Sequence, residues 1–118
     1  MEAQGAQQAD FYANECMNKK YTWQRTEEAA YTNRCYSFQA FSDGGKRDEA
    51  HAAAAWVIFA ISKGRCKEIW NGAIFLENKD SFQTETLAME YAIRHIHFII
   101  KKKSKSHSGV QLMHPPGL

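Results

Sequence analysis

The sequence has few cysteines, and they show no pattern that would join or coordinate them. There are three cysteines, an odd number, and no two of them stand at Cys-x-x-Cys spacing: Cys16, Cys35 and Cys66. The sequence therefore predicts neither a disulfide framework nor a zinc site, and it favours a reducing environment.

Long apolar runs are also missing. No run approaches the ~20 residues that a membrane-spanning helix needs, so we expect no membrane partner. The first ten residues, MEAQGAQQAD, lack both the basic and the apolar region of a secretory signal. We therefore expect an intracellular protein, either cytoplasmic or nuclear.

A strong excess of one charge is absent from the body of the chain. The net charge is +2, and four lysines with no acidic residue fall in residues 101–118. We expect this tail to be disordered. Its lysines could contact phosphate groups of a nucleic acid, act as a localisation signal or keep the tail solvated. They are Lys101, Lys102, Lys103 and Lys105.

What is present suits a single domain with a real core. The chain has 118 residues, of which 44% are hydrophobic and 13% aromatic. The pattern of residues 1–34 predicts weak helix, with a break near Lys19–Thr22 and a second helical piece from Thr26. We expect them to form a lead-in arm or the end of a preceding domain.

The middle of the chain predicts a meander of three antiparallel strands. Residues 35–42 alternate in polarity, which is typical of a strand, and residues 43–45 are expected to end or bend it. Residues 50–61 are apolar on both faces, as a central strand is. Residues 66–77 predict the return strand, with a bulge at Asn71–Gly72.

A helix is expected to follow and to cover the meander, which gives an α/β class. Asp80 or Ser81 can cap it, and with Asp80 as the cap Gln83 stands at the capping-box position. It should run to about residue 100. We expect an apolar stripe at helical spacing to face the sheet: Phe82, Met89, Ile93, Ile96 and Ile100.

Two carboxylates are placed against this predicted core. Glu85 falls on the same helical face as the stripe, where a carboxylate is costly unless it is paired or binds a metal. Glu85 could instead serve the helix dipole, and Asp43 with Gly44 could be an ordinary turn pair. Together, the two carboxylates have the oxygen ligands that Mg²⁺ prefers.

The residues from 36 to 96 resemble the type 1 ribonuclease H family, in particular the ribonuclease H domains of retroelement polyproteins. Three motifs carry the resemblance, in the same order as in the family. They are Ser42-Asp43-Gly44-Gly45 at the end of the first strand, the small-then-apolar run AAAAWVI from Ala52, and the helical segment TETLAM from Thr84.

The resemblance implies a ribonuclease H-like fold and metal-dependent hydrolysis of the RNA strand of an RNA–DNA hybrid. Asp43 and Glu85 would be catalytic and would hold Mg²⁺ or Mn²⁺. Family members use two such ions. We assign Gly44 and Gly45 of the first motif, together with the four lysines of the tail, as contacts to the nucleic acid.

The chain departs from the family after this helix. The family continues with a fourth, parallel strand and two further carboxylates, whereas no Asp or Glu follows Glu90. Residues 35–100 are therefore expected to form a partial domain, truncated after its first helix. The open strand edge near Phe38–Phe41 would invite self-association or a complementing chain. An inactive remnant that binds nucleic acid or a protein partner is the alternative function.

Overall fold

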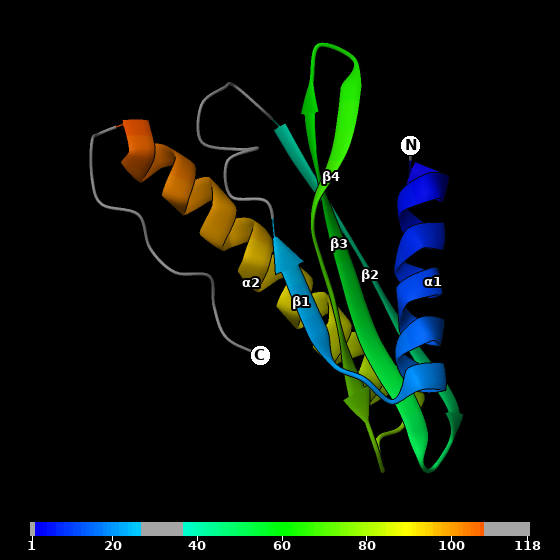
Figure 1. Ribbon diagram of the computed structural model, residues 1–118. Helices are drawn as coiled ribbons and strands as arrows, with labels where there is room; N and C mark the ends of the chain where they lie inside the picture. The colour runs from blue at the N-terminus through cyan, green and yellow to red at the C-terminus, as the bar shows by residue number, and fades with distance from the viewer. Residues whose placement is uncertain (1, 27–36, 108–118) are drawn as a thin grey trace.

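The computed structural model describes residues 2–26 and 37–107 (Figure 1). Its elements, in chain order, are α1 (Glu2–Lys19), β1 (Trp23–Thr26), β2 (Ser37–Asp48), β3 (His51–Ser62), β4 (Arg65–Leu76) and α2 (Ser81–His107). The strands form one antiparallel sheet in the order β1-β4-β3-β2. The two helices lie on opposite faces of this sheet, so the chain is an α/β protein with three layers.

Strand β2 is longer than the sequence predicted. It runs without a break through Asp43, Gly44 and Gly45, which pair with three alanines of β3. The expected end of the strand at residues 43–45 is therefore wrong, and the chain reverses at Glu49 and Ala50 instead. The glycines stay in the strand because helices pack closely on both of its faces there.

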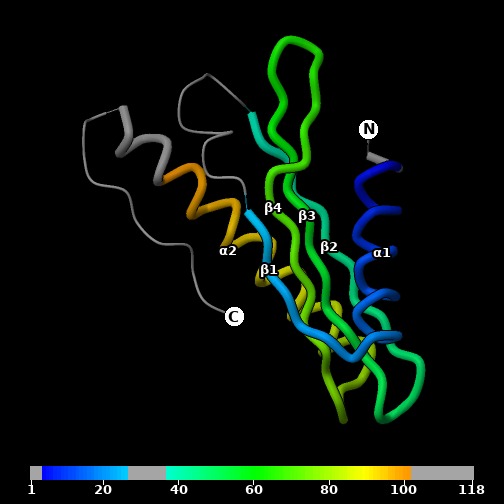
Figure 2. The backbone as a smooth tube through the Cα atoms, in the orientation of Figure 1, coloured from blue at the N-terminus to red at the C-terminus, as the bar shows by residue number. Residues whose placement is uncertain are grey.

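The β3–β4 hairpin is tight and carries an irregularity (Figure 2). Lys63 and Gly64 both have positive φ, 51° and 78°, as a type I′ turn requires. Ile58 pairs with Trp70 and the next residue with Glu68, so Ile69 is the extra, bulged residue. The predicted bulge at Asn71–Gly72 is wrong, since both residues pair in regular register.

Residues that we expected to lie outside the domain form part of its sheet and core. Strand β1 pairs antiparallel with β4, and its Trp23 stands opposite Ala73. Helix α1 buries a stripe of small or flexible residues, Ala9, Ala13, Cys16 and Met17, on the face of the sheet that Ala53, Ala55 and Ala73 line. Small residues on both sides let the helix approach the sheet closely. The second helical piece from Thr26 is not seen at that residue, which ends β1, and residues 27–36 lie outside the described residues.

The sheet has a fourth strand, which differs from the three-stranded meander that the sequence predicted. Strand β1 extends the sheet beyond β4, and it is antiparallel. Within the described residues, β2 pairs only with β3 and is an edge strand. The edge near Phe38–Phe41 is therefore the outer one, as expected.

Helix α2 begins as the sequence predicts. The Asp80 carboxylate accepts a hydrogen bond from the Gln83 main-chain N–H at 2.7 Å, and the Gln83 side chain accepts one from the Asp80 N–H at 3.0 Å. This reciprocal pair is a capping box. The helix continues to His107, so the four tail lysines lie in its last turns rather than in a disordered segment.

The buried face of α2 is not the predicted one. The predicted stripe points outward: Phe82, Met89, Ile93 and Ile100 are 76%, 54%, 60% and 51% exposed. The buried face is instead formed by Thr84, Ala88, Ala92, His95, Phe98 and Ile99. Bulky Trp56 and Trp70 rise from the sheet beneath α2, so alanines fit above them where larger side chains would not.

His95 joins α2 to three strands. Its ring stacks on Trp56 at 5.1 Å between centroids and meets Trp70 edge-on at 4.4 Å. Its Nδ1 lies 2.6 Å from the Tyr91 carbonyl oxygen, to which it donates, and its Nε2 lies 2.8 Å from the Gln24 side chain of β1. His95 is therefore a hydrogen-bonded core residue.

No helix in the described part of the chain is long and apolar enough to cross a membrane.

Candidate carboxylate site

Asp43 lies in the middle of β2, on the face of the sheet that α1 covers. Side chains alternate along a strand, and a Cβ added to Gly44 would meet α2 while one added to Gly45 would meet Met17 of α1. Asp43 therefore points to the same side as Gly45. Its pairing partner on β3 is Ala55, whose small side chain leaves room for a carboxyl group.

The closest acidic partner of Asp43 is Asp10 of α1. The two carboxyl groups are joined by a hydrogen bond, which requires a proton on one of them. Partial burial, then the hydrogen bond and the charge of Asp10, and finally the charge of Glu85 raise the pKa of Asp43 to about 6. Asp10 also accepts a hydrogen bond from Asn14 at 3.3 Å, one turn along the helix.

Glu85 lies on the other side of the sheet from Asp43. It is exposed at the start of the second turn of α2, so the prediction that it faces the sheet is wrong. Its main chain nevertheless packs directly on β2, because an added Cβ at Gly44 would lie 2.5 Å from the Glu85 nitrogen. The two predicted carboxylates thus flank one glycine from opposite faces, and the charge of Glu85 still acts on Asp43.

The chemistry of these donors fits one hard cation and does not fit two. Mg²⁺ keeps several waters and is held by one or two carboxylates together with substrate phosphates. Asp10 and Asp43 supply such a pair, on neighbouring elements. In the described parts of the chain, no three His, Cys, Asp or Glu residues are grouped closely enough to hold a metal. A second ion would therefore lack ligands.

Comparisons with family models, curated proteins and solved structures find no match to this chain.

The glycines predicted to contact nucleic acid have packing roles. Gly44 lies against the first turn of α2, and an added Cβ at Gly45 would come within 3.0 Å of the Met17 methyl group. Glycine allows both helices to approach β2 at adjacent positions. Of the predicted lysines, Lys101 is exposed on α2, and the side chains of the other three lie outside the described residues.

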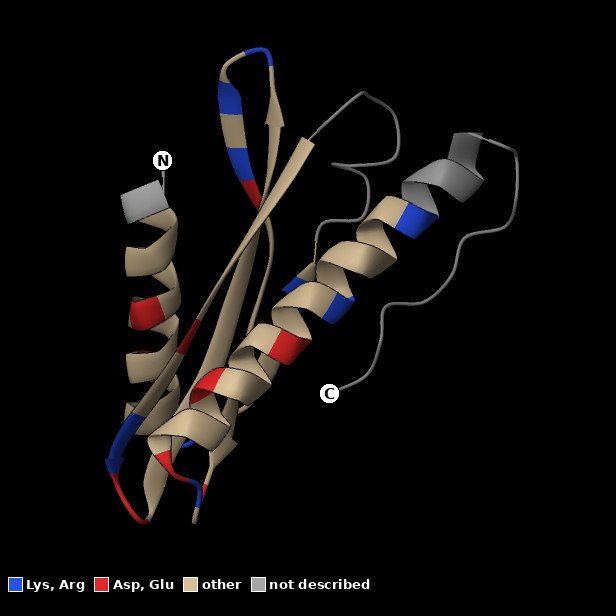
Figure 3. Ribbon diagram, turned by 180° about the vertical axis from the view of Figure 1, so that it is seen from behind, with Lys and Arg blue, Asp and Glu red and all other residues tan. Residues whose placement is uncertain are grey.

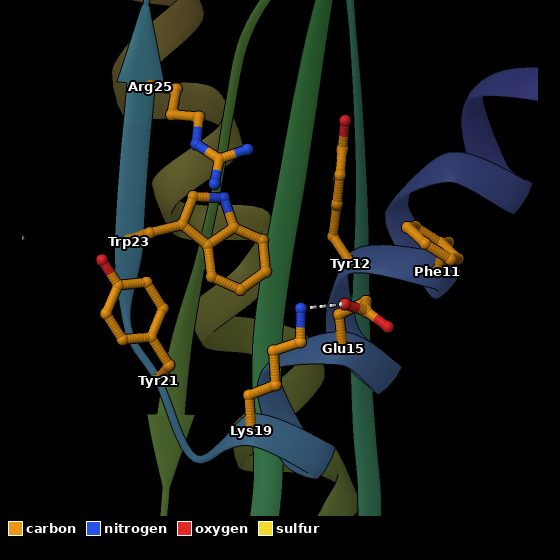
Figure 4. Close-up of a pocket in the computed structure, with 7 residues that line it drawn as sticks. All are labelled: Phe11, Tyr12, Glu15, Lys19, Tyr21, Trp23 and Arg25. Atoms are coloured by element: carbon orange, nitrogen blue, oxygen red, sulfur yellow. Dashed lines mark ion pairs between the residues drawn. The ribbon is translucent and has the colours of Figure 1, made fainter.

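A pocket of about 260 Å³ opens between α1 and β1 (Figure 4). It is lined by Phe11, Tyr12, Glu15, Lys19, Tyr21, Trp23 and Arg25. Tyr21 is 57% exposed and stacks on Trp23 at 6.2 Å, and the Arg25 guanidinium lies 5.9 Å from the Trp23 ring centre. Exposed aromatic faces beside cations are the chemistry that contacts nucleotide bases and phosphates.

Sequence reasoning missed Asp10 because it treated the first segment as an arm. A signal was available: Ala9, Ala13 and Cys16 recur at helical spacing and predict one buried face. Asp10 directly follows the first of these residues. Its partner, in contrast, lies 33 residues further along the chain, and no local pattern points to it.

Proposed function

We propose that this chain is a ribonuclease H-type domain that acts on RNA–DNA hybrids in a metal-dependent manner. One observation carries the proposal: the first turn of α2 packs on Gly44, directly after Asp43 in β2. An acid-glycine motif in the first strand of the meander, two more antiparallel strands, and then a helix whose main chain packs on that motif follow the order of elements that the resemblance implies.

The residues that would hold Mg²⁺ or Mn²⁺ are Asp43 and Asp10, which share one face of the sheet. Glu85, the other carboxylate that the resemblance implies, lies on the opposite face and acts on Asp43 only through its charge. When bound, such an ion polarises a phosphate oxygen and lowers the pKa of a coordinated water. Asp43 has to lose its proton to act as a ligand. Since its pKa is raised to about 6, the proton competes with the ion, and binding should weaken as pH falls below that value.

Cleavage of a labelled RNA–DNA hybrid in Mg²⁺ and in Mn²⁺ tests the proposal. We expect cleavage of the RNA strand that EDTA stops and that Asp43→Asn and Asp10→Asn reduce at least tenfold. Glu77→Gln is the matched control, because Glu77 is an exposed carboxylate after β4. Cleavage that is unchanged in Asp43→Asn would refute the assignment, as would its absence from a folded wild-type chain.

A second candidate function is binding of nucleic acid without cleavage. It is favoured by the pocket of Figure 4, whose rings and cations do not depend on a metal. We expect binding that weakens as salt rises, since phosphate contacts release counterions. Tyr21→Ala should weaken binding of single-stranded RNA, while Tyr21→Phe keeps the stacking face and should leave binding nearly unchanged. Equal affinities for the two variants would exclude the pocket.

A further inference from the structure

The outward face of α2 carries a regular apolar seam. Its members alternate at spacings of four and three residues: Phe82, Thr86, Met89, Ile93, Ile96 and Ile100. This is the spacing of a and d positions in a coiled coil. Of the five apolar members, only Ile96 is also packed in part against the core; the other four are more than half exposed.

A second apolar face sets α2 apart from an ordinary surface helix. Such a helix buries one stripe against the core and presents polar residues to solvent. Helix α2 already buries its core stripe, which includes Ala88 and Ile99, against the sheet. None of the other elements described here covers the seam, and α2 is the outermost layer on its side of the sheet (Figure 1).

The seam is symmetric about residue 91. If α2 is laid antiparallel on a second α2 with that residue at the centre, Phe82 meets Ile100 of the second copy and Met89 meets its Ile93. Thr86 then meets Ile96 in the same way. A surface that is complementary to itself in this manner fits a twofold, isologous interface. The seam spans 19 residues, or about 27 Å of helix.

The charges beside the seam favour the same orientation. Glu85 and Glu90 lie in the first half of α2, and Arg94 and Lys101 lie in the second half (Figure 3). Antiparallel pairing sets acidic halves against basic halves, whereas parallel pairing sets like charges together. Glu90 and Arg94 pair with each other at 3.2 Å within one helix, so the bias comes chiefly from Glu85 and Lys101 nearer the ends of the seam. Charge therefore favours the antiparallel orientation, and the apolar seam supplies the contact.

The first end of the seam also has space for a side chain. A hollow of about 230 Å³ lies beside Phe82, with Gln83, Thr86 and Glu90 among its walls. In the antiparallel arrangement this end faces Ile100 of the second copy. A protruding isoleucine beside a hollow suits the knobs-into-holes packing of paired helices.

We propose that the outer face of α2 is a homodimer interface, in which α2 packs antiparallel on α2 of a second copy of this chain. The association thus uses a helix face rather than the open edge of β2. The proposal does not depend on the function of the Asp10–Asp43 pair, because both residues lie on the other side of the sheet.

Sedimentation velocity of the full chain over a range of micromolar concentrations tests it. We expect a dimer for the wild type and at least a tenfold weaker dimer for Ile93→Glu, because twofold symmetry brings two such charges together near the axis. Met89→Glu is the second variant, since Met89 lies opposite Ile93 in the proposed dimer. Both residues are more than half exposed, so circular dichroism should show an intact fold.

Phe11→Glu is the matched control, because Phe11 is 54% exposed but belongs to α1. It should leave the dimer unchanged. A wild-type chain that stays monomeric at about 100 µM would overturn the proposal, because that concentration lies well above the dissociation constants of stable dimers. So would Ile93→Glu and Met89→Glu variants that dimerise as the wild type does.

Discussion

Replacing Asp10 by asparagine should stabilise this protein at neutral pH. The pKa of Asp43 is raised from 3.8 to about 6, first by partial burial and then by Asp10. In a fully buried site a difference of that size would correspond to about 3 kcal/mol. Asp10 is exposed and is only one of the causes, so solvent screening reduces its share to about 0.5–1 kcal/mol.

The direction of the pH dependence follows from proton binding. Between about pH 4 and 6 the folded chain holds a proton on Asp43 that the unfolded chain has already released. The contribution of Asp43 to the free energy of unfolding must therefore fall as pH rises through this window and level off above it. In Asp10→Asn the fall should be smaller, because the neighbouring negative charge is gone.

Urea unfolding of both proteins in EDTA at pH 4 and pH 7 provides the measurement. We expect Asp10→Asn to gain about 0.5–1 kcal/mol at pH 7 and almost nothing at pH 4. The control variant Glu77→Gln should change little at either pH. Adding Mg²⁺ should then stabilise the wild type more than Asp10→Asn, since the ion needs the Asp10 carboxylate. An equal gain at both pH values, or none at pH 7, would refute the carboxyl pair.

Two further predictions concern the packing of α2. Gly44→Ala should lower the free energy of unfolding in urea by about 2–3 kcal/mol, because the new methyl would meet the main chain of Glu85. Main chain cannot move aside as a flexible side chain could. A loss under about 0.5 kcal/mol would contradict this contact. Ile99→Ala should cost about 3 kcal/mol and the adjacent Ile100→Ala under about 1 kcal/mol in the isolated protomer, since Ile99 is fully buried and Ile100 is half exposed. Equal losses of stability in the two variants would show that the Ile99 face of α2 is not the one that packs on the sheet.

Several local features were predictable because neighbouring residues determine them. The capping box at Asp80 and Gln83 follows from three-residue spacing and a short helical turn. The alternation and length of apolar runs likewise indicated the strands of the meander. The end of the first strand was predicted wrongly at residues 43–45, because Asp-Gly usually marks a turn. Here the glycines stay in the strand because helices pack closely on both of its faces.

The sequence by itself determined the order of the three meander strands and the long helix, since periodicity and capping act over a few residues. Only the tertiary structure decided which of the two apolar faces of α2 is buried, because the bulk of Trp56 and Trp70 selects alanines for the contact. Only the tertiary structure brought Asp10 to Asp43. That pairing depends on how α1 docks on the sheet, and docking is a property of surfaces assembled from distant parts of the chain.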